Sequence, residues 1–350
     1  MTPRVAEALR IIAARRPLPR EIAEEVFQDL MDGKATEAQK GAILLGIATR
    51  GETAEEVTGA VAALRSRMRR VPTKRAPLLD TCGPGGLSRD LFNLSTAAAI
   101  VAAGAGASVA KHGNRSITSR VGSADVLAAA GIAIELEPAT AGALLDEVGL
   151  VFLFAPSFHP AMKELGTVRR ELGVRTIFNA LGPLANPAGA SRQMIGVGRP
   201  ELVRLLADAL AALGTERAIV FHTEIGFDEL VPGLPAFGVE VQDGWTRPWR
   251  YEPAALPQRE VSLTDLAGGD AGENAAMLRS LLEGQPGARR EAVLLNAALG
   301  LLVEGRAHDL PEGYERAREA VDSGAARDVF ERLRQASARA KSPEAEARRS

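Results

Sequence analysis

Hydrophobic side chains recur three or four residues apart along the first 70 residues of the chain. Separate runs of this kind begin at Val5, Ile22 and Ile43, with short polar breaks between them. This spacing places the apolar positions on one face of a helix. We therefore expect a bundle of short helices over residues 1–70, with room for a segment from later in the chain to complete it.

The polar breaks carry signals for the start of a helix. Pro19 and Thr36 each precede a helical run, and Thr53 is followed three residues later by Glu56, the pattern of a capping box. These signals predict where the helices of the N-terminal part begin.

The pattern changes after Val71. The stretch VPTKRAP predicts a linker, and PLLDTCGPGG predicts a short strand that runs into a glycine turn. Further β-like runs, mostly separated by Ala- and Leu-rich helical stretches, are predicted at 108–110, 150–154, 193–197, 217–221 and 238–241. This alternation predicts an α/β domain with a mainly parallel central sheet over residues 71–337.

The remaining segments predict the end of that domain. Residues 232–235 and 242–248 have the composition of loops, while 289–303 and 314–336 return to helical spacing. We expect residues 338–350 to form a disordered tail.

Composition and charge limit the class of protein and the kinds of partner to which this sequence can belong. The chain has 350 residues with 46% hydrophobic and 25% charged residues, which is typical of a folded globular protein and not of a disordered one. Its formal net charge of -2 argues against nucleic acid and anionic membrane as partners.

Cysteine content and hydropathy indicate the cellular compartment in which the protein is expected. The single cysteine, Cys82, excludes an internal disulfide framework and is compatible with a reducing cytoplasm. The first residues lack the pattern of a signal peptide, and the apolar stretch from about residue 96 to 110 is too short for a membrane span. We expect a cytoplasmic protein.

The glycine turn Gly83–Gly86 precedes a helix-prone stretch, a context in which backbone amides converge on an anion. Taken alone, such a cluster is more often a tight turn. The following Asn93, Ser95 and Thr96 could bind phosphate or a hard cation, although a simple N-cap needs only one of them.

A second polar segment, 111–120, follows the predicted strand 108–110. It combines Lys111, Arg115 and other cations with several hydroxyl groups, the mixture of donors that a polyphosphate requires. A helix start near Gly122 would add further amides. The alternative is a loop whose charges face water.

Adjacent carboxylates, Asp228 and Glu229, follow the predicted strand 217–221. The carboxyl ends of strands are where open α/β sheets bind ligands, and two such oxygen donors suit Mg²⁺. Taken alone, an Asp-Glu pair is usually a turn that faces solvent.

These segments together resemble the anthranilate phosphoribosyltransferase family. The likeness covers most of the chain and is carried by FNLST, KHGNRSITSRVGSADVL, APSFHPAMKELGTVRRELGVRTIFNALGPLANPA and GFDEL. The resemblance implies a helical domain and a larger α/β domain joined by a hinge, and a homodimer. It also implies transfer of the phosphoribosyl group of phosphoribosyl pyrophosphate to anthranilate, in tryptophan biosynthesis, with Mg²⁺.

The resemblance also implies roles for particular residues. Lys111, Asn114 and Arg115 would be catalytic, and Ser95, Asp228 and Glu229 would hold magnesium. The substrates would contact Gly83, Gly86, Leu87, Leu91, Asn93, Leu94, Ser95, Thr96, Lys111, His112, Gly113, Asn114, Arg115, Ser119, Ser123, His159, Arg169 and Pro183. Among these, Asn114 and Arg169 would meet the aromatic acid, and the two histidines would line its approach.

The glycine loop departs from the family pattern Gly-Thr-Gly-Gly-Asp. Here it reads Gly83-Pro84-Gly85-Gly86-Leu87, and Leu91 replaces a later threonine. Pro84 removes one backbone donor and Leu87 removes an acceptor. The polar residues of segment 88–90, Ser-Arg-Asp, are candidates to compensate.

Three interpretations follow from the sequence. The first is an active anthranilate phosphoribosyltransferase with a divergent loop. The second is a relative that uses another aromatic acceptor or another donor. The third is a non-catalytic nucleic-acid-binding relative, which the net charge disfavours. Asn114, His159 and Arg169 favour the first.

Overall fold

Four helices form the N-terminal part of the chain, as the sequence predicts: α1 (Pro3–Ala13), α2 (Arg20–Met31), α3 (Glu37–Arg50) and α4 (Ala54–Arg67). The computed structural model describes residues 2–84, 91–115, 121–256 and 261–340. The predicted helix starts are confirmed, because the Thr36 and Thr53 side chains accept hydrogen bonds from the third backbone amide of their helices, completing capping boxes with Gln39 and Glu56.

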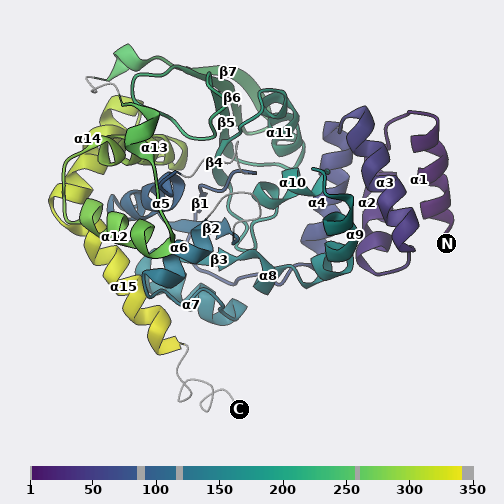
Figure 1. Cartoon of the computed structure of the whole chain (residues 1–350), viewed down its shortest axis with the longest axis horizontal. Helices are drawn as coiled ribbons and strands as arrows, with labels where there is room; N and C mark the ends of the chain where they lie inside the picture. Colours follow the sequence, from purple (N-terminus) through teal and green to yellow (C-terminus); the bar gives the residue numbers. More distant parts are fainter. Residues whose placement is uncertain (1, 85–90, 116–120, 257–260, 341–350) are drawn as a thin grey trace.

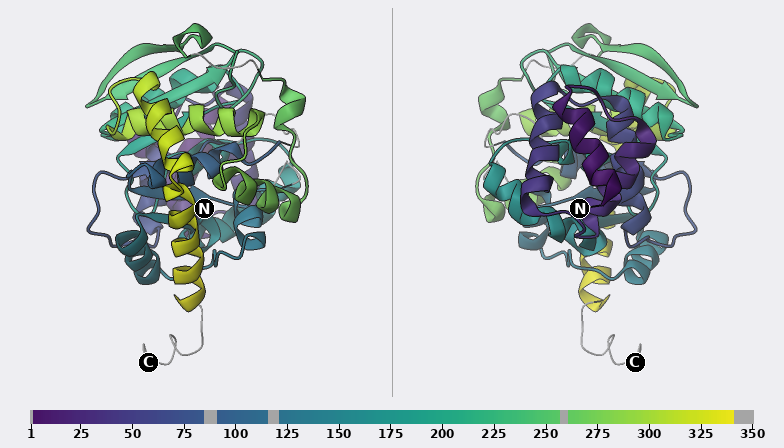
Figure 2. Two further views of the ribbon diagram at one scale, coloured as in Figure 1. Left: turned by 90° about the vertical axis from the view of Figure 1, so that its left-hand side faces the viewer. Right: turned by 90° about the vertical axis from the view of Figure 1, so that its right-hand side faces the viewer.

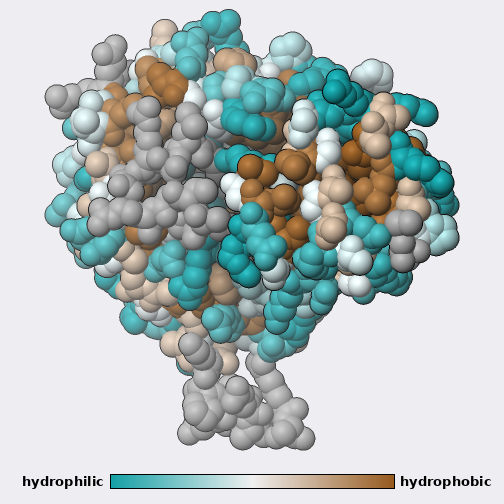
Figure 3. Space-filling model, turned by 45° about the vertical axis from the view of Figure 1, so that its right-hand side comes forward, coloured by the Kyte–Doolittle hydropathy of each residue, from teal (hydrophilic) through white to brown (hydrophobic). Residues whose placement is uncertain are grey.

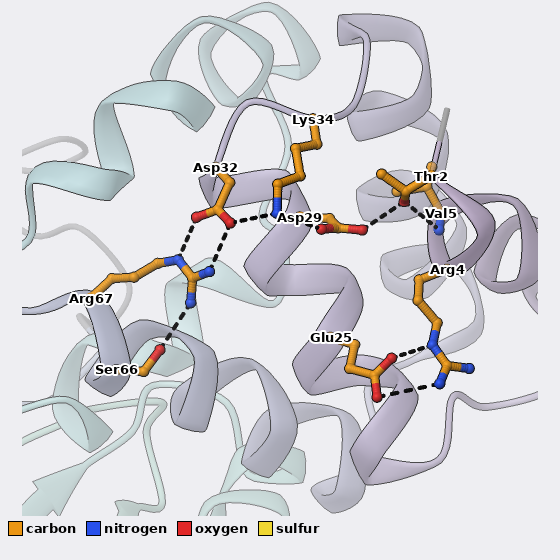
Figure 4. A network of polar contacts seen from close by, with 9 residues as sticks. All are labelled: Thr2, Arg4, Val5, Glu25, Asp29, Asp32, Lys34, Ser66 and Arg67. Carbon is orange, nitrogen blue, oxygen red and sulfur yellow. Dashed lines mark hydrogen bonds and ion pairs between the residues drawn. The ribbon is translucent and has the colours of Figure 1, made fainter.

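Ion pairs fix the ends of these helices (Figure 4). Asp32, just after α2, accepts two hydrogen bonds from the Arg67 guanidinium, at 2.6 and 2.9 Å, and also pairs with Lys34. Arg67 lowers the pKa of Asp32 to about 2, with Lys34 adding to the effect. The two parallel hydrogen bonds from Arg67 to Asp32 therefore connect the end of α4 to the end of α2.

Seven strands form one sheet in the order β3-β2-β1-β4-β5-β6-β7. The first five of these run parallel and the last two are antiparallel, which confirms the mainly parallel sheet. The strands are β1 (Leu79–Asp80), β2 (Val109–Gly113), β3 (Leu150–Phe154), β4 (Arg192–Gly196), β5 (Arg217–Thr223), β6 (Ala236–Gln242) and β7 (Trp245–Tyr251).

Helices cover both faces of the sheet (Figure 1). They are α5 (Leu94–Gly104), α6 (Ser123–Ala129), α7 (Pro138–Val148), α8 (Ala155–Phe158), α9 (Gly166–Leu172), α10 (Phe178–Leu181), α11 (Glu201–Ala212), α12 (Ala271–Leu282), α13 (Ala288–Glu304), α14 (Leu310–Asp322) and α15 (Ala325–Ala340). Short 3-10 turns are η1 (Pro160–Leu165), η2 (Gly182–Leu184), η3 (Pro253–Ala255) and η4 (Leu263–Leu266). Within the described ranges, none of these helices has the length and apolar character to cross a membrane.

Alternating side chains of the sheet enter two hydrophobic cores. Ala218 and Val220 of β5 join the core shared with α1–α4 and α11, whereas Ile219 and Phe221 join the core shared with α5 and α13. This alternation explains how a single strand connects the two halves of the molecule.

Later segments pack on the N-terminal helices, which lie at one end of the molecule (Figure 2). Both η1 and α9 contact α2 or α3, and α11 contacts α4. The Phe27 ring of α2 meets the Phe178 ring of α10 edge-on, with centroids 5.5 Å apart. The domain limits at residues 70 and 337 stay a prediction.

The structure differs from the sequence predictions at three places. Residues 242–248 are not a loop, because Asp243 and Gly244 have positive φ angles and turn the chain from β6 into β7. The helical run 314–336 is broken by Gly324, with φ of 84°, between α14 and α15. Residues 338–340 continue α15, and the rest of the predicted tail lies outside the described residues.

Candidate functional site

Lys111 lies within strand β2 rather than in the loop predicted after residue 110. The strand continues because its parallel pairing with β3 extends through Lys111, His112 and Gly113, opposite Phe152, Leu153 and Phe154. The side chain of Lys111 is 4% exposed, so its ammonium group is held in the interior at the carboxyl end of the sheet.

The Lys111 ammonium group connects three parts of this edge. It donates to the carbonyl and hydroxyl oxygens of Thr81, at 3.2 and 3.0 Å, and to the hydroxyl of Ser95 at 3.3 Å. Burial lowers the Lys111 pKa, while the nearby acid groups, Glu229 among them, raise it again. Lys111, Ser95 and Glu229, which the sequence predicts to bind phosphoribosyl pyrophosphate or its magnesium ion, therefore gather in one place.

Two close backbone approaches bring Asp228 and Glu229 to the same edge. A Cβ atom on Gly83 would lie 2.6 Å from the Gly196 carbonyl oxygen, and one on Gly196 would lie 1.6 Å from that of Asp228. Burial, and next the adjacent Asp228, raise the pKa of Glu229 well above its usual value. Such crowded carboxylates gain stability from a bound cation.

The start of α5 contradicts the simple N-cap interpretation. Asn93 occupies the cap position but its side chain caps no amide. The Asn93 Oδ1 and Thr96 Oγ1 atoms are buried without hydrogen-bond partners. Since buried polar atoms are normally paired, these groups are available to a ligand.

Asp80 and Asn186 were not predicted as site residues, yet they hold this edge together. Asp80 accepts hydrogen bonds from the backbone amides of Cys82 and His112, both at 3.1 Å, and from the Asn186 side-chain amide at 2.8 Å. Asn186 also donates to the Ala110 carbonyl at 2.7 Å. Burial, the dominant effect, raises the Asp80 pKa to about 6.

Asp80, Cys82 and His112 lie close enough to suggest a second metal site, since one ligand atom of each lies within 4.8 Å of the others. Burial raises the Cys82 pKa to about 12, so the thiol keeps its proton. Asp80 is already committed to three donors. We therefore interpret this group as structural.

The two predicted histidines form a buried pair. Their ring centroids are 5.1 Å apart. Burial lowers the pKa of His112 to about 3 and that of His159 to about 4, so both rings are neutral near pH 7. His112 Nδ1 contacts the Gly182 carbonyl at 2.9 Å, which leaves Nε2 as an unpaired acceptor. Both ring nitrogens of His159 are buried, and a backbone contact with Ala185 raises its pKa against the larger effect of burial.

Arg169 lies in α9, with its guanidinium carbon 5.4 Å from the centre of the Phe178 ring. It is half-buried, burial lowers its pKa, and no carboxylate within the described ranges forms an ion pair with it. Pro183 is buried in η2, and its carbonyl accepts a hydrogen bond of 2.5 Å from Gln193. Arg169 is thus a candidate partner for a carboxylate.

Asn114 and Arg115 are exposed beyond the end of β2. Arg115 pairs with Asp125 at 2.7 Å and lies 5.7 Å from the centre of the Phe154 ring. The Ser123 hydroxyl donates to the Asn114 carbonyl at 3.3 Å, at the helix start predicted near Gly122. Asn114 and Arg115 therefore follow Lys111 closely in the chain but are exposed, whereas Lys111 is buried.

The remaining predicted residues divide into two groups. Leu91 forms a β-bridge with Ala267, and Leu94 begins α5. Gly86, Leu87 and Ser119 lie outside the described residues, as does the segment 88–90.

Comparisons with known proteins identify the family. Residues 75–327 match the model of the glycosyl transferase family a/b domain, and residues 6–68 match its helical bundle domain. Anthranilate phosphoribosyltransferase of Anaeromyxobacter dehalogenans (strain 2CP-C) is 48% identical over 331 residues, covering 94% of this chain and 97% of the relative.

Solved structures give the same result. The anthranilate phosphoribosyltransferase of Thermus thermophilus is 42% identical with a TM-score of 0.89, covering 94% of this chain and 99% of that one. The Saccharomyces cerevisiae enzyme, solved in complex with PRPP and Mg, is 25% identical with a TM-score of 0.86, covering 95% and 98%. The chain belongs to the anthranilate phosphoribosyltransferase family.

Proposed function

We propose that this protein transfers the phosphoribosyl group of phosphoribosyl pyrophosphate to the amine of anthranilate, releasing pyrophosphate, in tryptophan biosynthesis. The observation that carries the proposal is the buried Lys111 ammonium group, held beside Ser95 and Glu229 at the carboxyl end of the sheet. A buried cation next to acidic groups and free hydroxyls suits a ligand that brings phosphates and a metal ion.

Ser95, Asp228 and Glu229 are the proposed magnesium ligands. The fit rests on the raised pKa of Glu229, since burial and the adjacent Asp228 disfavour its negative charge in the absence of a cation. Bound Mg²⁺ would neutralise charge on the departing pyrophosphate. Lys111 and the free Asn93 and Thr96 oxygens would hold the donor beside it.

The proposed acceptor site lies between the histidine pair and Arg169. Arg169 would bind the carboxylate of anthranilate with two parallel hydrogen bonds. The unpaired Nε2 of His112 would accept a hydrogen bond from the aromatic amine, which orients its lone pair. Since pKa values of about 3 and about 4 make both imidazoles weak proton acceptors, we assign them lining and orientation rather than general-base catalysis.

The reaction needs alignment and charge stabilisation more than proton removal. The arylamine is a neutral nucleophile, so its nitrogen forms the bond to the anomeric carbon as the bond from that carbon to pyrophosphate breaks. The two electrons of the broken bond leave with pyrophosphate, and the amine proton is lost after the new bond forms. Lys111 would stabilise the departing charge, and Asn114 and Arg115 would contact the substrates.

The first experiment measures the fluorescence decrease of anthranilate with phosphoribosyl pyrophosphate and Mg²⁺. Turnover is the expected result. Donor binding without turnover would indicate a different acceptor, and loss of both would favour a non-catalytic binding protein. A phosphoribosyl product on another aromatic acid would identify the second interpretation directly.

Replacing Arg169 by alanine tests the acceptor site. The Arg169→Ala protein should have an anthranilate KM raised about tenfold or more, with a much smaller change for phosphoribosyl pyrophosphate, because charged hydrogen bonds are worth about 1.5 to 3 kcal/mol. Steady-state kinetics measure both constants. The exposed neighbour Arg170 supplies the control, since Arg170→Ala should leave both near the wild-type values. Equal increases in both constants for Arg169→Ala would contradict the assignment.

We also propose a homodimer joined through the helical part, in the cytoplasm. The exposed Leu45 on α3, together with the hydrophobic residues that gather on the side where the helical part comes forward (Figure 3), supports the dimer. The single free thiol of Cys82 is compatible with a reducing compartment.

A further inference from the structure

We propose that a small oxyanion of the phosphate class binds in a second pocket, between α3, α10 and α11. This pocket has a volume of about 70 Å³ and shares no lining residue with the proposed donor and acceptor sites. Glu52, Arg175, Thr176, Asn179 and Arg199 give it polar walls. The inference goes beyond the proposed function, because it adds an anion that the reaction itself does not place there.

The pocket is formed where three separate segments meet. Glu52 follows α3, Arg175 and Thr176 precede α10, and Arg199 follows β4 just before α11. Arg175 also donates to the Pro84 carbonyl at 3.5 Å, which links the pocket to the glycine turn. An anion here would connect the helical part to the carboxyl end of the sheet.

Buried donors without a hydrogen bond in this pocket favour a bound ligand. Thr176 is 3% exposed, and its hydroxyl is buried without a hydrogen-bond partner. Arg199 Nε is also buried and lacks a hydrogen bond, although it lies 3.3 Å from the Glu201 carboxylate. The side-chain oxygen of Asn179 accepts a hydrogen bond from the Thr176 backbone amide at 3.0 Å. The NH₂ group of Asn179 is therefore the part of this side chain that could donate to an anion. Native structures rarely leave such groups unpaired.

Charge selects an anion rather than a neutral ligand. Two guanidinium groups and a single carboxylate, Glu52, are among the residues that line the pocket, and Arg199 also pairs with Glu201 outside it. Burial and then the charge of Arg199 lower the Arg175 pKa, while the carboxylates of Asp228 and Glu52 raise it. A bound oxyanion would accept hydrogen bonds from the Arg175 and Arg199 guanidinium groups and from the unpaired Thr176 hydroxyl, all of which line the pocket. The volume admits one tetrahedral oxyanion but no aromatic acid.

Calorimetric titration of inorganic phosphate into the full-length protein tests the inference. Arg199→Leu should weaken binding about tenfold, and Thr176→Val, which keeps both charges, should weaken it about threefold. Arg204→Leu is the matched control, because Arg204 lies on α11 outside the pocket and pairs with Asp208. Circular dichroism and thermal melting establish that each variant is folded.

Two further arms identify the site and the source of the anion. Phosphate that is displaced by phosphoribosyl pyrophosphate with Mg²⁺ occupies the site of that substrate. The proposal therefore requires that phosphate still binds when phosphoribosyl pyrophosphate is saturating. Tighter, Arg199-dependent binding of pyrophosphate would identify the released product as the source, and equal or weaker binding would identify free phosphate.

The inference is overturned if the wild type, Arg199→Leu and Arg204→Leu proteins bind phosphate equally. It is also overturned if saturating phosphoribosyl pyrophosphate abolishes the phosphate binding that depends on Arg199. The proposed function would fail separately, as absent turnover of anthranilate, whatever the phosphate titrations show.

Discussion

Asp80 is the residue on which the geometry of the buried site depends most. Its carboxyl group ties the turn after β1 to the amide of His112 and to Asn186. Lys111 and His112 are consecutive, so the same interaction sets the position of the ammonium group and of the imidazole. Loss of the Asp80 carboxyl group would therefore disturb the donor and acceptor sites together.

The raised pKa of Asp80 predicts a dependence of stability on pH. Because the folded-state pKa is about 6 and the ordinary value is 3.8, Asp80 binds its proton more tightly in the folded protein than in the unfolded chain. Its contribution to the free energy of unfolding is present below pH 3.8 and is lost as pH rises through 6, a change of up to about 3 kcal/mol. Urea denaturation of wild type and Asp80→Asn from pH 4 to 7 measures the difference. A difference that does not change with pH would contradict the prediction.

The buried histidine pair gives a prediction of opposite sign. Burial depresses both pKa values, to about 3 for His112 and about 4 for His159, so their stabilising contribution is present above about pH 6.5 and is lost on acidification. In ¹H–¹⁵N spectra both imidazoles should stay neutral from pH 5 to 8, with the proton of His112 on Nδ1. Signals that shift with a midpoint near pH 6.5 would show that the rings are solvated. His112→Asn and His159→Asn assign the two signals.

At the scale of elements, the sequence predicts the helices better than it predicts where strands end. Helix starts are encoded locally, as the capping boxes at Thr36 and Thr53 show. The end of β2 is set by pairing with β3, about 40 residues away along the chain, which no local pattern reports. The Asp243-Gly244 turn was a local signal that the prediction missed.

The contact between β4 and the loop that carries Asp228 has a direct test. Gly196→Ala would place a Cβ atom 1.6 Å from the Asp228 carbonyl oxygen, so the acidic loop must move. We expect the KM for phosphoribosyl pyrophosphate with Mg²⁺ to rise severalfold more than that for anthranilate. We also expect a loss of about 1 to 3 kcal/mol in stability.

Steady-state kinetics and urea denaturation measure these two effects. Gly166→Ala is the control, since its Cβ would meet nothing within 4 Å. An unchanged donor KM in a folded Gly196→Ala protein would show that the Asp228 loop has no part in binding the donor.

At the scale of the whole molecule, the sequence indicated the chemistry of the site but not its scaffold. Lys111, Ser95 and Glu229 stood out as polar residues in distinctive segments, and the structure brings them together. Asp80 and Asn186 had the pattern of an ordinary strand end and loop, because their partners lie up to 106 residues away. Only the folded chain reveals which distant polar groups satisfy each other.

The proposed dimer gives a prediction at this scale. Leu45 on α3 is 46% exposed, and hydrophobic residues gather on the side of the molecule where the helical part comes forward (Figure 3). Leu45→Glu should shift the protein from dimer to monomer in sedimentation velocity, because a charge in an apolar interface is costly. Phe237→Glu, on β6 and 43% exposed in wild type, should leave the assembly unchanged. A dimer that persists in Leu45→Glu would place the interface elsewhere.

The packing of α9 and α11 on the N-terminal helices also bears on how the chain is made. A ribosome releases α1–α4 well before it releases α9 and α11, which cover parts of α3 and α4. For that interval the nascent helices expose apolar surface with no native partner. The protein should thus depend on chaperones most while its middle third is being translated.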